Sequence, residues 1–258
     1  RGWVSEQIES AFIPRARKIA HRKDSITGVS EYPSIGDAPL DRPTPDYHQL
    51  RQAATDRLAA RRPAEIEPAS AGRGVVAFAC QAASQGASVG QLARLLEFKF
   101  TSIRIPPLAP HIFAAPFEEL RDASDRWLAA HGRRPLVFLA NLGPIAQHSA
   151  RATYATGFFT AGGFEVASNA GFDDASAAAA ALKQSGARIA VICSSDAVYQ
   201  EMAPSVARAL KQAGARTVVL AGHPGGNESV WRKAGVDRFI FIKCDVLAIL
   251  RELLCEEG

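Results

Sequence analysis

The second half of the chain alternates between short apolar runs and longer stretches with helical spacing. Five runs rich in apolar and β-branched residues predict strands at 136–140, 164–168, 188–193, 216–220 and 238–242. Helices are predicted at 147–161, 174–185, 197–213, 228–234 and 246–254. Strands that alternate with helices in this way are typical of a parallel sheet covered on both faces. The pattern therefore predicts a five-stranded, flavodoxin-like (Rossmann-type) α/β domain.

The ends of these predicted helices carry residues that favour starts and stops. Gly162, Gly186, Gly214 and Gly235 each follow a predicted helix, where a left-handed backbone is common because glycine has no Cβ. Asp245 precedes the last helix and is expected to cap its first turn. These residues support the predicted ends of the helices.

The first 135 residues follow a different pattern. Prolines interrupt the segment 34–71 and leave room for one short helix at 47–60. Further helices are expected at 75–98 and 116–130, and a basic helical segment is expected at 11–23. This part of the sequence predicts an irregular arm, partly helical and rich in proline, ahead of the α/β domain.

Charge and hydropathy exclude two classes of partner. The formal net charge is +4, from 30 basic and 26 acidic residues, and the whole excess lies before Pro135. The basic residues are mixed with acids and form no clustered stripe, which argues against nucleic-acid binding. No apolar run approaches the roughly 20 residues that cross a bilayer, and the start has no signal-peptide core. We therefore expect a cytoplasmic protein, and because Met202 is the only methionine, a piece of a longer chain.

The cysteines give no sign of a metal centre. Cys80, Cys193, Cys244 and Cys255 are far apart and form no C-x-x-C pair. This spacing argues against both a zinc site and a disulfide framework. Buried free thiols are the expected state of all four, and no metal site is predicted.

The turn after the first predicted strand carries the first recognisable motif. The segment 141–151 reads NLGPIAQHSAR and is similar to the start of the cobalamin-binding domain of cobalamin-dependent mutases. In that family the segment carries Asp-x-His-x-x-Gly, in which the histidine ligates cobalt, the aspartate orients it and the glycine lets the corrin tail approach the backbone. Aligned without gaps from Gly143, these three places fall on Ile145, Gln147 and Ala150. The resemblance therefore implies a degenerate cobalamin-binding domain.

Two further signatures of the family are also altered. Its Ser-x-Leu after the third strand falls on Ser194 and Asp196, and its Gly-Gly after the fourth falls on Ala221 and Gly222. Asp196 puts a carboxylate where the nucleotide tail of the cofactor needs apolar contact, which costs binding unless the charge finds a partner. Only Ser194 and Gly222 keep the residue types of the family.

The resemblance extends upstream of this domain. The segment 22–33 (RKDSITGVSEYP) looks like the end of the mutase barrel, and 108–110 with 116–121 are similar to the approach to the C-terminal domain. As a whole, the chain resembles the C-terminal part of the small, non-catalytic subunit of methylmalonyl-CoA mutase. The resemblance implies three parts: 1–38 as the end of a TIM-barrel region, 39–135 as a linker with short helices, and 136–258 as the cobalamin-binding-like domain.

The resemblance also implies a function and a partner. In a heterodimeric mutase of this kind, a large subunit binds adenosylcobalamin and isomerises methylmalonyl-CoA and succinyl-CoA by a radical path. The present chain is then expected to contribute structure to that subunit, with no catalytic residue, no bound cofactor and no metal of its own. The pocket positions that remain for a cofactor are Gly143, His148, Ser194 and Gly222.

Other hypotheses remain open at this point. The chain could be an isomerase component that still binds cobalamin weakly, with His148 near the cobalt, although His148 stands one residue beyond the ligand place, about 100° further round a helix. It could also be an unrelated response-regulator-like or small-ligand-binding domain, which needs an acidic cluster where Asn141 and Cys193 stand. The linker could self-associate instead of contacting a large subunit.

Overall fold

A computed structural model describes residues 2–36, 45–61, 65–66, 74–98 and 107–257. The contacts divide the chain into two compact units, one formed by Arg1–Asp37 with Ala109–Gly258 and the other by Ala38–Leu108. Each unit is described by itself below. In the part of the chain that the structure describes, no helix is long and apolar enough to cross a bilayer.

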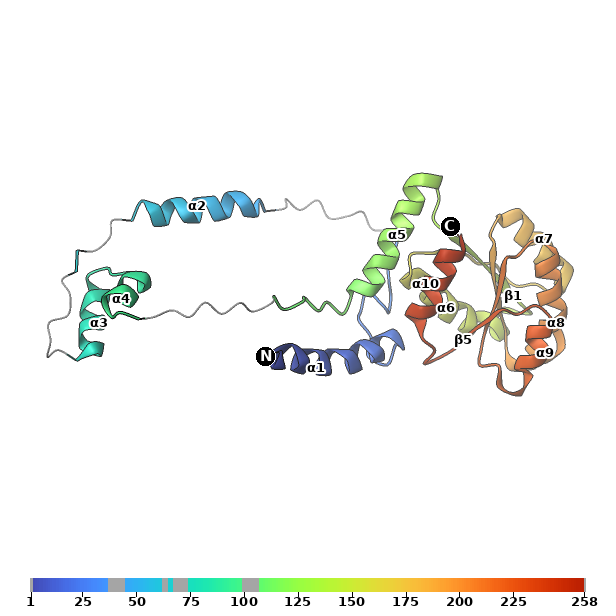
Figure 1. Cartoon of the computed structure of the whole chain (residues 1–258). Coiled ribbons are helices and arrows are strands. Elements are labelled where there is room, and N and C mark those ends of the chain that lie inside the picture. The colour runs from blue at the N-terminus through green and yellow to red at the C-terminus, as the bar shows by residue number, and fades with distance from the viewer. Residues whose placement is uncertain (1, 37–44, 62–64, 67–73, 99–106, 258) are drawn as a thin grey trace. The chain divides into compact units, whose positions relative to one another are not determined.

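The first unit is built on a five-stranded parallel sheet (Figure 1). Its strands are β1 (Leu136–Asn141), β2 (Glu165–Ala167), β3 (Ile189–Cys193), β4 (Thr217–Ala221) and β5 (Arg238–Ile240). The strand order is β2-β1-β3-β4-β5, and all four pairings are parallel. This arrangement confirms the predicted flavodoxin-like fold, and the predicted strand ends differ from the observed ones by at most two residues.

Helices cover both faces of the sheet, as predicted. They are α6 (Ile145–Ala161), α7 (Ala175–Ser185), α8 (Asp196–Gln212), α9 (Glu228–Lys233) and α10 (Val246–Glu257). A short 3-10 turn, η1 (Gly225–Asn227), precedes α9. Two separate apolar clusters show which helices share a face, because α6 and α10 contribute to one and α7, α8 and α9 to the other.

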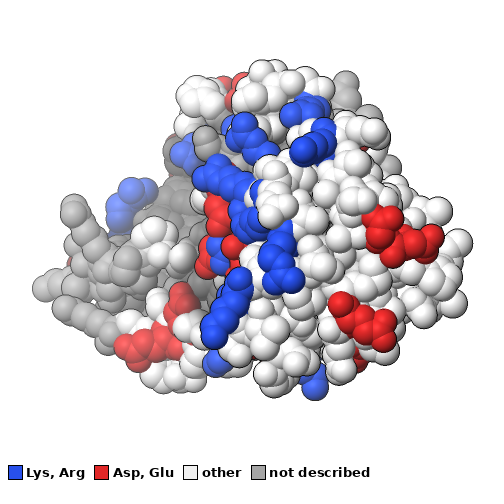
Figure 2. Space-filling view, turned by 90° about the vertical axis from the view of Figure 1, so that its right-hand side faces the viewer, with Lys and Arg blue, Asp and Glu red and all other residues white. Residues whose placement is uncertain are grey.

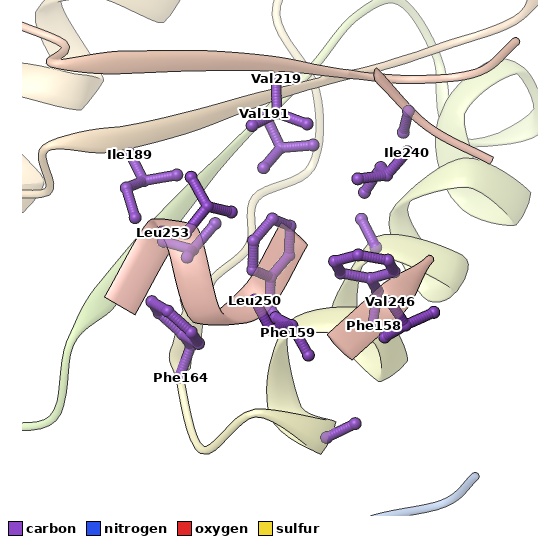
Figure 3. Packing of buried hydrophobic residues seen from close by; sticks show 14 of the residues in the cluster. Phe158, Phe159, Phe164, Ile189, Val191, Val219, Ile240, Val246, Leu250 and Leu253 are labelled. Carbon is purple, nitrogen blue, oxygen red and sulfur yellow. The ribbon is translucent and has the colours of Figure 1, made fainter. Parts of the chain in front are cut away.

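The cluster under α6 and α10 is dominated by aromatic rings (Figure 3). Phe158, Phe159 and Phe164 are fully buried, and neighbouring rings meet edge-on with centroids 5.2 and 5.8 Å apart. Leu250 and Leu253 of α10 lie beside these rings on the same side of the strands. Successive side chains of a strand point to opposite faces, so β3 supplies alternate residues to both clusters, which gives the sheet its nearly continuous apolar strands.

One predicted helix stop is wrong by a residue. Gly186, Gly214 and Gly235 have positive φ as expected, whereas Gly162 has φ −91° and Gly163, at φ +83°, takes the left-handed position instead. Gly163 must also lack a side chain, because a Cβ there would be 2.7 Å from the Cβ of Ser124. The Ser124 hydroxyl donates to the Gly163 carbonyl at 2.6 Å, so this turn joins the sheet domain to the helix that carries Ser124.

That helix, α5 (Ala115–His131), and the N-terminal helix α1 (Trp3–Ala20) belong to the same unit as the sheet. Ile19 of α1 is buried in the cluster beneath α6 and α10. Arg121 of α5 donates to the Gly28 carbonyl at 3.1 Å. The helix α1 begins earlier and ends earlier than the basic helix expected at 11–23. The expected division of the chain at residues 38 and 135 stays a prediction.

The second unit holds three helices in its described residues. They are α2 (Tyr47–Ala59), α3 (Val75–Ser84) and α4 (Val89–Leu95). The single helical region expected at 75–98 is wrong, because Gly86 has φ +93° and Ser88 forms a capping box with Gln91 that starts a new helix. Most of the prolines that predicted an irregular arm lie outside the described residues.

The predicted cap of α10 is confirmed and can be tested directly. The backbone N–H of Ala248 donates to Oδ1 of Asp245 at 3.0 Å. We expect Asp245→Ala to lower the free energy of unfolding by about 1 kcal/mol, because one N–H of the first turn loses its acceptor. Asp245→Asn keeps an oxygen there and should cost less than about 0.5 kcal/mol. Urea denaturation of both variants measures the difference, and equal losses would contradict the capping role.

Candidate functional site

The candidate site lies at the carboxyl edge of the sheet. In the strand order β2-β1-β3-β4-β5, the chain leaves β1 toward one side and β3 toward the other, and ligands of such sheets bind at this reversal. Asn141 and Cys193 are opposite each other as the last residues of these two strands. Neither is acidic, and burial raises the pKa of the Cys193 thiol far above its ordinary value.

The turn after β1 and the start of α6 hold two of the four predicted pocket positions. Gly143 has φ +72°, and its carbonyl oxygen lies 3.0 Å from Nδ1 of His148. The His148 side chain belongs to a residue that is only 3% exposed. The structure therefore brings Gly143 and His148 together, with the imidazole turned into the protein and one of its two nitrogens already hydrogen-bonded.

A buried tyrosine holds the turn after β3 in place through hydrogen bonds. The Ser194 hydroxyl donates to the Leu142 carbonyl at 2.9 Å, and the Ser194 N–H donates to Oη of Tyr199 at 2.9 Å. The Tyr199 hydroxyl donates in turn to the Ala221 carbonyl at 2.8 Å. Both Ser194 and Tyr199 are fully buried, and burial raises the pKa of the phenol well above its usual range. One side chain on α8 thus joins the ends of β3 and β4.

An arginine side chain lies against the turn after β4. A Cβ on Gly222 would come within 2.3 Å of Nη1 of Arg151, so the absent side chain leaves room for a guanidinium. Nη1 of Arg151 donates to the Ala221 carbonyl at 2.6 Å, and Nη2 pairs with Asp196 at 2.9 Å. The guanidinium also lies 5.8 Å from the centre of the Tyr199 ring. We call Arg151, Asp196 and Tyr199 together the Arg151 plug.

Curated proteins of one kind match this chain. The methylmalonyl-CoA mutase small subunit of Streptomyces virginiae is 36% identical over 257 residues, which cover 100% of this chain and 32% of that protein. The probable small subunit of the same mutase in Mycobacterium tuberculosis (strain ATCC 25618 / H37Rv) is 30% identical over 257 residues, 99% of this chain and 31% of that protein. No family model matches the chain. This chain is a homologue of methylmalonyl-CoA mutase small subunits.

The chain spans about a third of the length of these small subunits, in their C-terminal part. A third relative, the methylmalonyl-CoA mutase small subunit of Porphyromonas gingivalis (strain ATCC BAA-308 / W83), is 33% identical over 147 residues, 57% of this chain and 23% of that protein. The resemblance inferred from the motifs is thus confirmed at the level of the small-subunit family.

In this mutase small-subunit homologue, the places of the cobalt-ligand motif face outward. Ile145 is 64% exposed, and Gln147 and Ala150 are exposed as well. Beside Arg151, a cavity of about 380 Å³ is lined by Tyr154, His223 and Phe241 among others. Burial and the neighbouring Cys244 thiol raise the pKa of Tyr154 above its ordinary value. The cavity therefore offers aromatic and neutral walls next to a single guanidinium.

A larger hollow of about 840 Å³ lies beside α6 at the carboxyl edge of the sheet, and its lining includes Asn141, His148, Ser149 and Asn169. No group of three histidine, cysteine or acidic side chains that could hold a metal ion occurs among the residues that the structure describes. All four cysteines are free thiols, but the expectation that all are buried is wrong, since Cys80 and Cys255 are exposed.

The sequence analysis missed the role of Arg151 and Tyr199. It noted that Asp196 would need a partner, and Arg151 is that partner. The available signal was an arginine and a carboxylate near the starts of the helices that follow β1 and β3, which neighbouring parallel strands bring together. Tyr199 gave no such signal, because a tyrosine on an amphipathic helix is usually part of the core.

Proposed function

We propose that this chain forms the C-terminal portion of the non-catalytic small subunit of a heterodimeric, adenosylcobalamin-dependent methylmalonyl-CoA mutase. In this proposal the large subunit binds the cofactor and interconverts methylmalonyl-CoA and succinyl-CoA. The present chain binds no adenosylcobalamin and acts in structure and assembly. Homology to proteins named as small subunits of this mutase supports the proposal. A cytoplasmic location is part of the same proposal.

The observation that carries the proposal is the Arg151 plug. The residues at the carboxyl edge do not fit a corrin cofactor, because the guanidinium occupies the space that Gly222 leaves open. Asp196 and Ala221 hold that guanidinium from two sides. A nucleotide tail entering here would have to displace a charged group that already has its hydrogen bonds, which is costly unless they are replaced.

The geometry disfavours cobalamin binding through His148. A cobalt ligand needs an accessible imidazole nitrogen, usually with its other nitrogen donating to a carboxylate or carbonyl. His148 has the second feature, through the Gly143 carbonyl, but only 3% of the residue is exposed, in the wall of the 840 Å³ hollow. The exposed position of the motif is occupied by Gln147, whose amide is a poor ligand for cobalt.

A corrinoid titration tests the proposal. We expect no saturable change in the corrin absorbance when the purified chain is titrated with adenosylcobalamin or hydroxocobalamin. A His148→Ala variant is titrated in parallel and is expected to behave in the same way. A saturable spectral shift in the parent chain that the variant loses would overturn the proposal and make the chain a cofactor-binding component.

The partner is tested by co-purification. We expect a tagged form of this chain to retain a methylmalonyl-CoA mutase large subunit in a defined ratio when the two are expressed together. A tagged α/β domain of unrelated sequence is the control for non-specific retention. If the chain instead elutes only as an oligomer of itself, in the presence of the large subunit, the assembly role is wrong.

A further inference from the structure

A second, separate pocket lies at the amino edge of the sheet, opposite the candidate site. It has a volume of about 380 Å³ and is formed by the end of α5, the start of β1 and the turn that leads into β3. Three arginines and one histidine line it: Arg133, Arg134, Arg188 and His131. Among the described residues that line it there is no carboxylate. Like charges gathered without an acid are costly unless an anion accompanies them.

Two of these arginines are available to a ligand. Arg134 is held in the wall, because its guanidinium pairs with Asp125 at 2.6 Å and donates to the Ser124 hydroxyl at 3.1 Å. Arg133 and Arg188 are exposed, and within the described parts of the chain neither has a carboxylate at ion-pair distance. They therefore carry uncompensated charge at the mouth of the pocket.

The backbone fixes where these two guanidinium groups lie. Gly186 ends α7 with φ +68°, and its Cβ position is 3.4 Å from Nη1 of Arg133. Arg188 follows Gly186 by two residues and precedes β3 directly. Arg133 precedes β1, and β1 and β3 are hydrogen-bonded neighbours. Because adjacent strands begin side by side, the fold itself places the two arginines on the same side of the pocket.

An aromatic pair forms another part of the lining. The rings of Trp127 and His131 stack with their centroids 3.9 Å apart, and Nδ1 of His131 lies 3.1 Å from the Trp127 carbonyl. Both residues sit on the last turn of α5, one helical turn apart. The pocket thus combines free guanidinium groups with a flat ring surface.

The wider surface adds to the positive potential. Arg216 stands before β4 and Arg238 begins β5, so basic residues precede or begin four of the five strands along this edge. Arg238 is neutralised by Glu252 and Glu256, whereas Arg216 has no ion pair with any residue that the structure describes. On the face seen in Figure 2, Lys and Arg side chains form a band down the middle, with Asp and Glu side chains on both sides of it.

We propose that this pocket is a binding site for a small molecule that carries a diphosphate group. Arginine forks match phosphate oxygens with two parallel hydrogen bonds, and two free arginines can serve two phosphates. The volume lies within the range of small-molecule sites. The ring wall of Trp127 and His131 offers a stacking surface to any base or ring attached to the phosphates. This inference does not depend on whether the carboxyl edge binds a corrinoid.

Calorimetric titration of the full chain at low ionic strength tests the site, with inorganic pyrophosphate, ADP and adenosine as probes. We expect saturable 1:1 binding of pyrophosphate and ADP and none of adenosine. Tighter binding of ADP than of pyrophosphate would assign the ring wall a part in binding, and equal binding would assign the affinity to the diphosphate alone. Binding of adenosine as tight as that of ADP would overturn the proposal.

Two double variants distinguish binding in the pocket from non-specific attraction by the net positive charge of the chain. We expect the double variant Arg133→Gln, Arg188→Gln to weaken pyrophosphate binding at least about tenfold. The loss of one charge-assisted hydrogen bond raises the Kd by roughly that factor. Arg208→Gln with Lys233→Gln removes the same charge from exposed positions on α8 and α9 and should leave binding within about twofold. If the parent chain shows no saturable binding, or if both double variants lose equally, the pocket is not a specific site.

Discussion

Replacing Tyr199 by phenylalanine lowers the free energy of unfolding by about 2–3 kcal/mol. The phenol oxygen accepts the Ser194 N–H and donates to the Ala221 carbonyl, at 2.9 and 2.8 Å. Without it, the Ser194 N–H is left inside the protein with no acceptor, since Ser194 is fully buried. The ring itself stays, with its edge-on contact to Trp231 at 6.0 Å, so the loss reports the hydroxyl and not the packing.

Tyr154→Phe is the matched control for this change. The Tyr154 hydroxyl has a weaker partner, the Cys244 thiol at 3.9 Å, and its loss should cost less than about 1 kcal/mol. Guanidinium denaturation of the three proteins, followed by circular dichroism, gives both values from the shift in midpoint at constant slope. A Tyr199→Phe variant as stable as Tyr154→Phe would show that the buried hydroxyl does not hold the strand ends together.

The elements of the α/β domain were predictable because their signals are local. Each strand is a short run of β-branched or apolar residues, and each ends at a polar or glycine-rich turn. One error falls where a longer-range contact decides, and the other where a local capping signal was missed. Gly163, not Gly162, takes the left-handed position, in a turn whose carbonyl accepts a hydrogen bond from Ser124 on a distant helix. The region 75–98 breaks because Ser88 and Gln91 cap each other.

The sequence predicted the candidate site only as an altered motif. The resemblance places the family motif on Ile145, Gln147 and Ala150, and this prediction needs only the sequence. The contacts of Arg151 needed coordinates, because the hydrogen bond between Arg151 and the Ala221 carbonyl spans 70 residues of sequence. Neither hydrophobic periodicity nor helix capping contains information about such a contact.

Removal of the plug arginine is the second large effect that we expect. Arg151→Met keeps the apolar stem of the side chain but removes the guanidinium, and we expect a loss of about 2 kcal/mol in the free energy of unfolding. The Ala221 carbonyl keeps its bond from Tyr199, so the loss comes from one charge-assisted hydrogen bond and from the contacts above Gly222.

The Asp196 ion pair should contribute little of that loss. The Asp196 side chain is 76% exposed, and ion pairs of this exposure are worth less than about 1 kcal/mol. A double-mutant cycle of Arg151→Met with Asp196→Asn measures the interaction free energy between the two side chains. This energy is the difference between the effect of the double variant and the sum of the two single effects. Coupling close to the whole Arg151 effect would contradict the assignment of the energy to Ala221 and Gly222.

The same variant separates the two causes of the proposed loss of cofactor binding. Arg151→Met frees the space above Gly222 but restores neither the cobalt ligand nor its orienting acid, whose places hold Gln147 and Ile145. We therefore expect the corrin spectrum of hydroxocobalamin to stay unchanged when the variant is added. A spectral shift typical of imidazole on cobalt would mean that His148 can turn outward once Arg151 is gone. In that case the plug alone, and not the missing ligand motif, would keep the cofactor out.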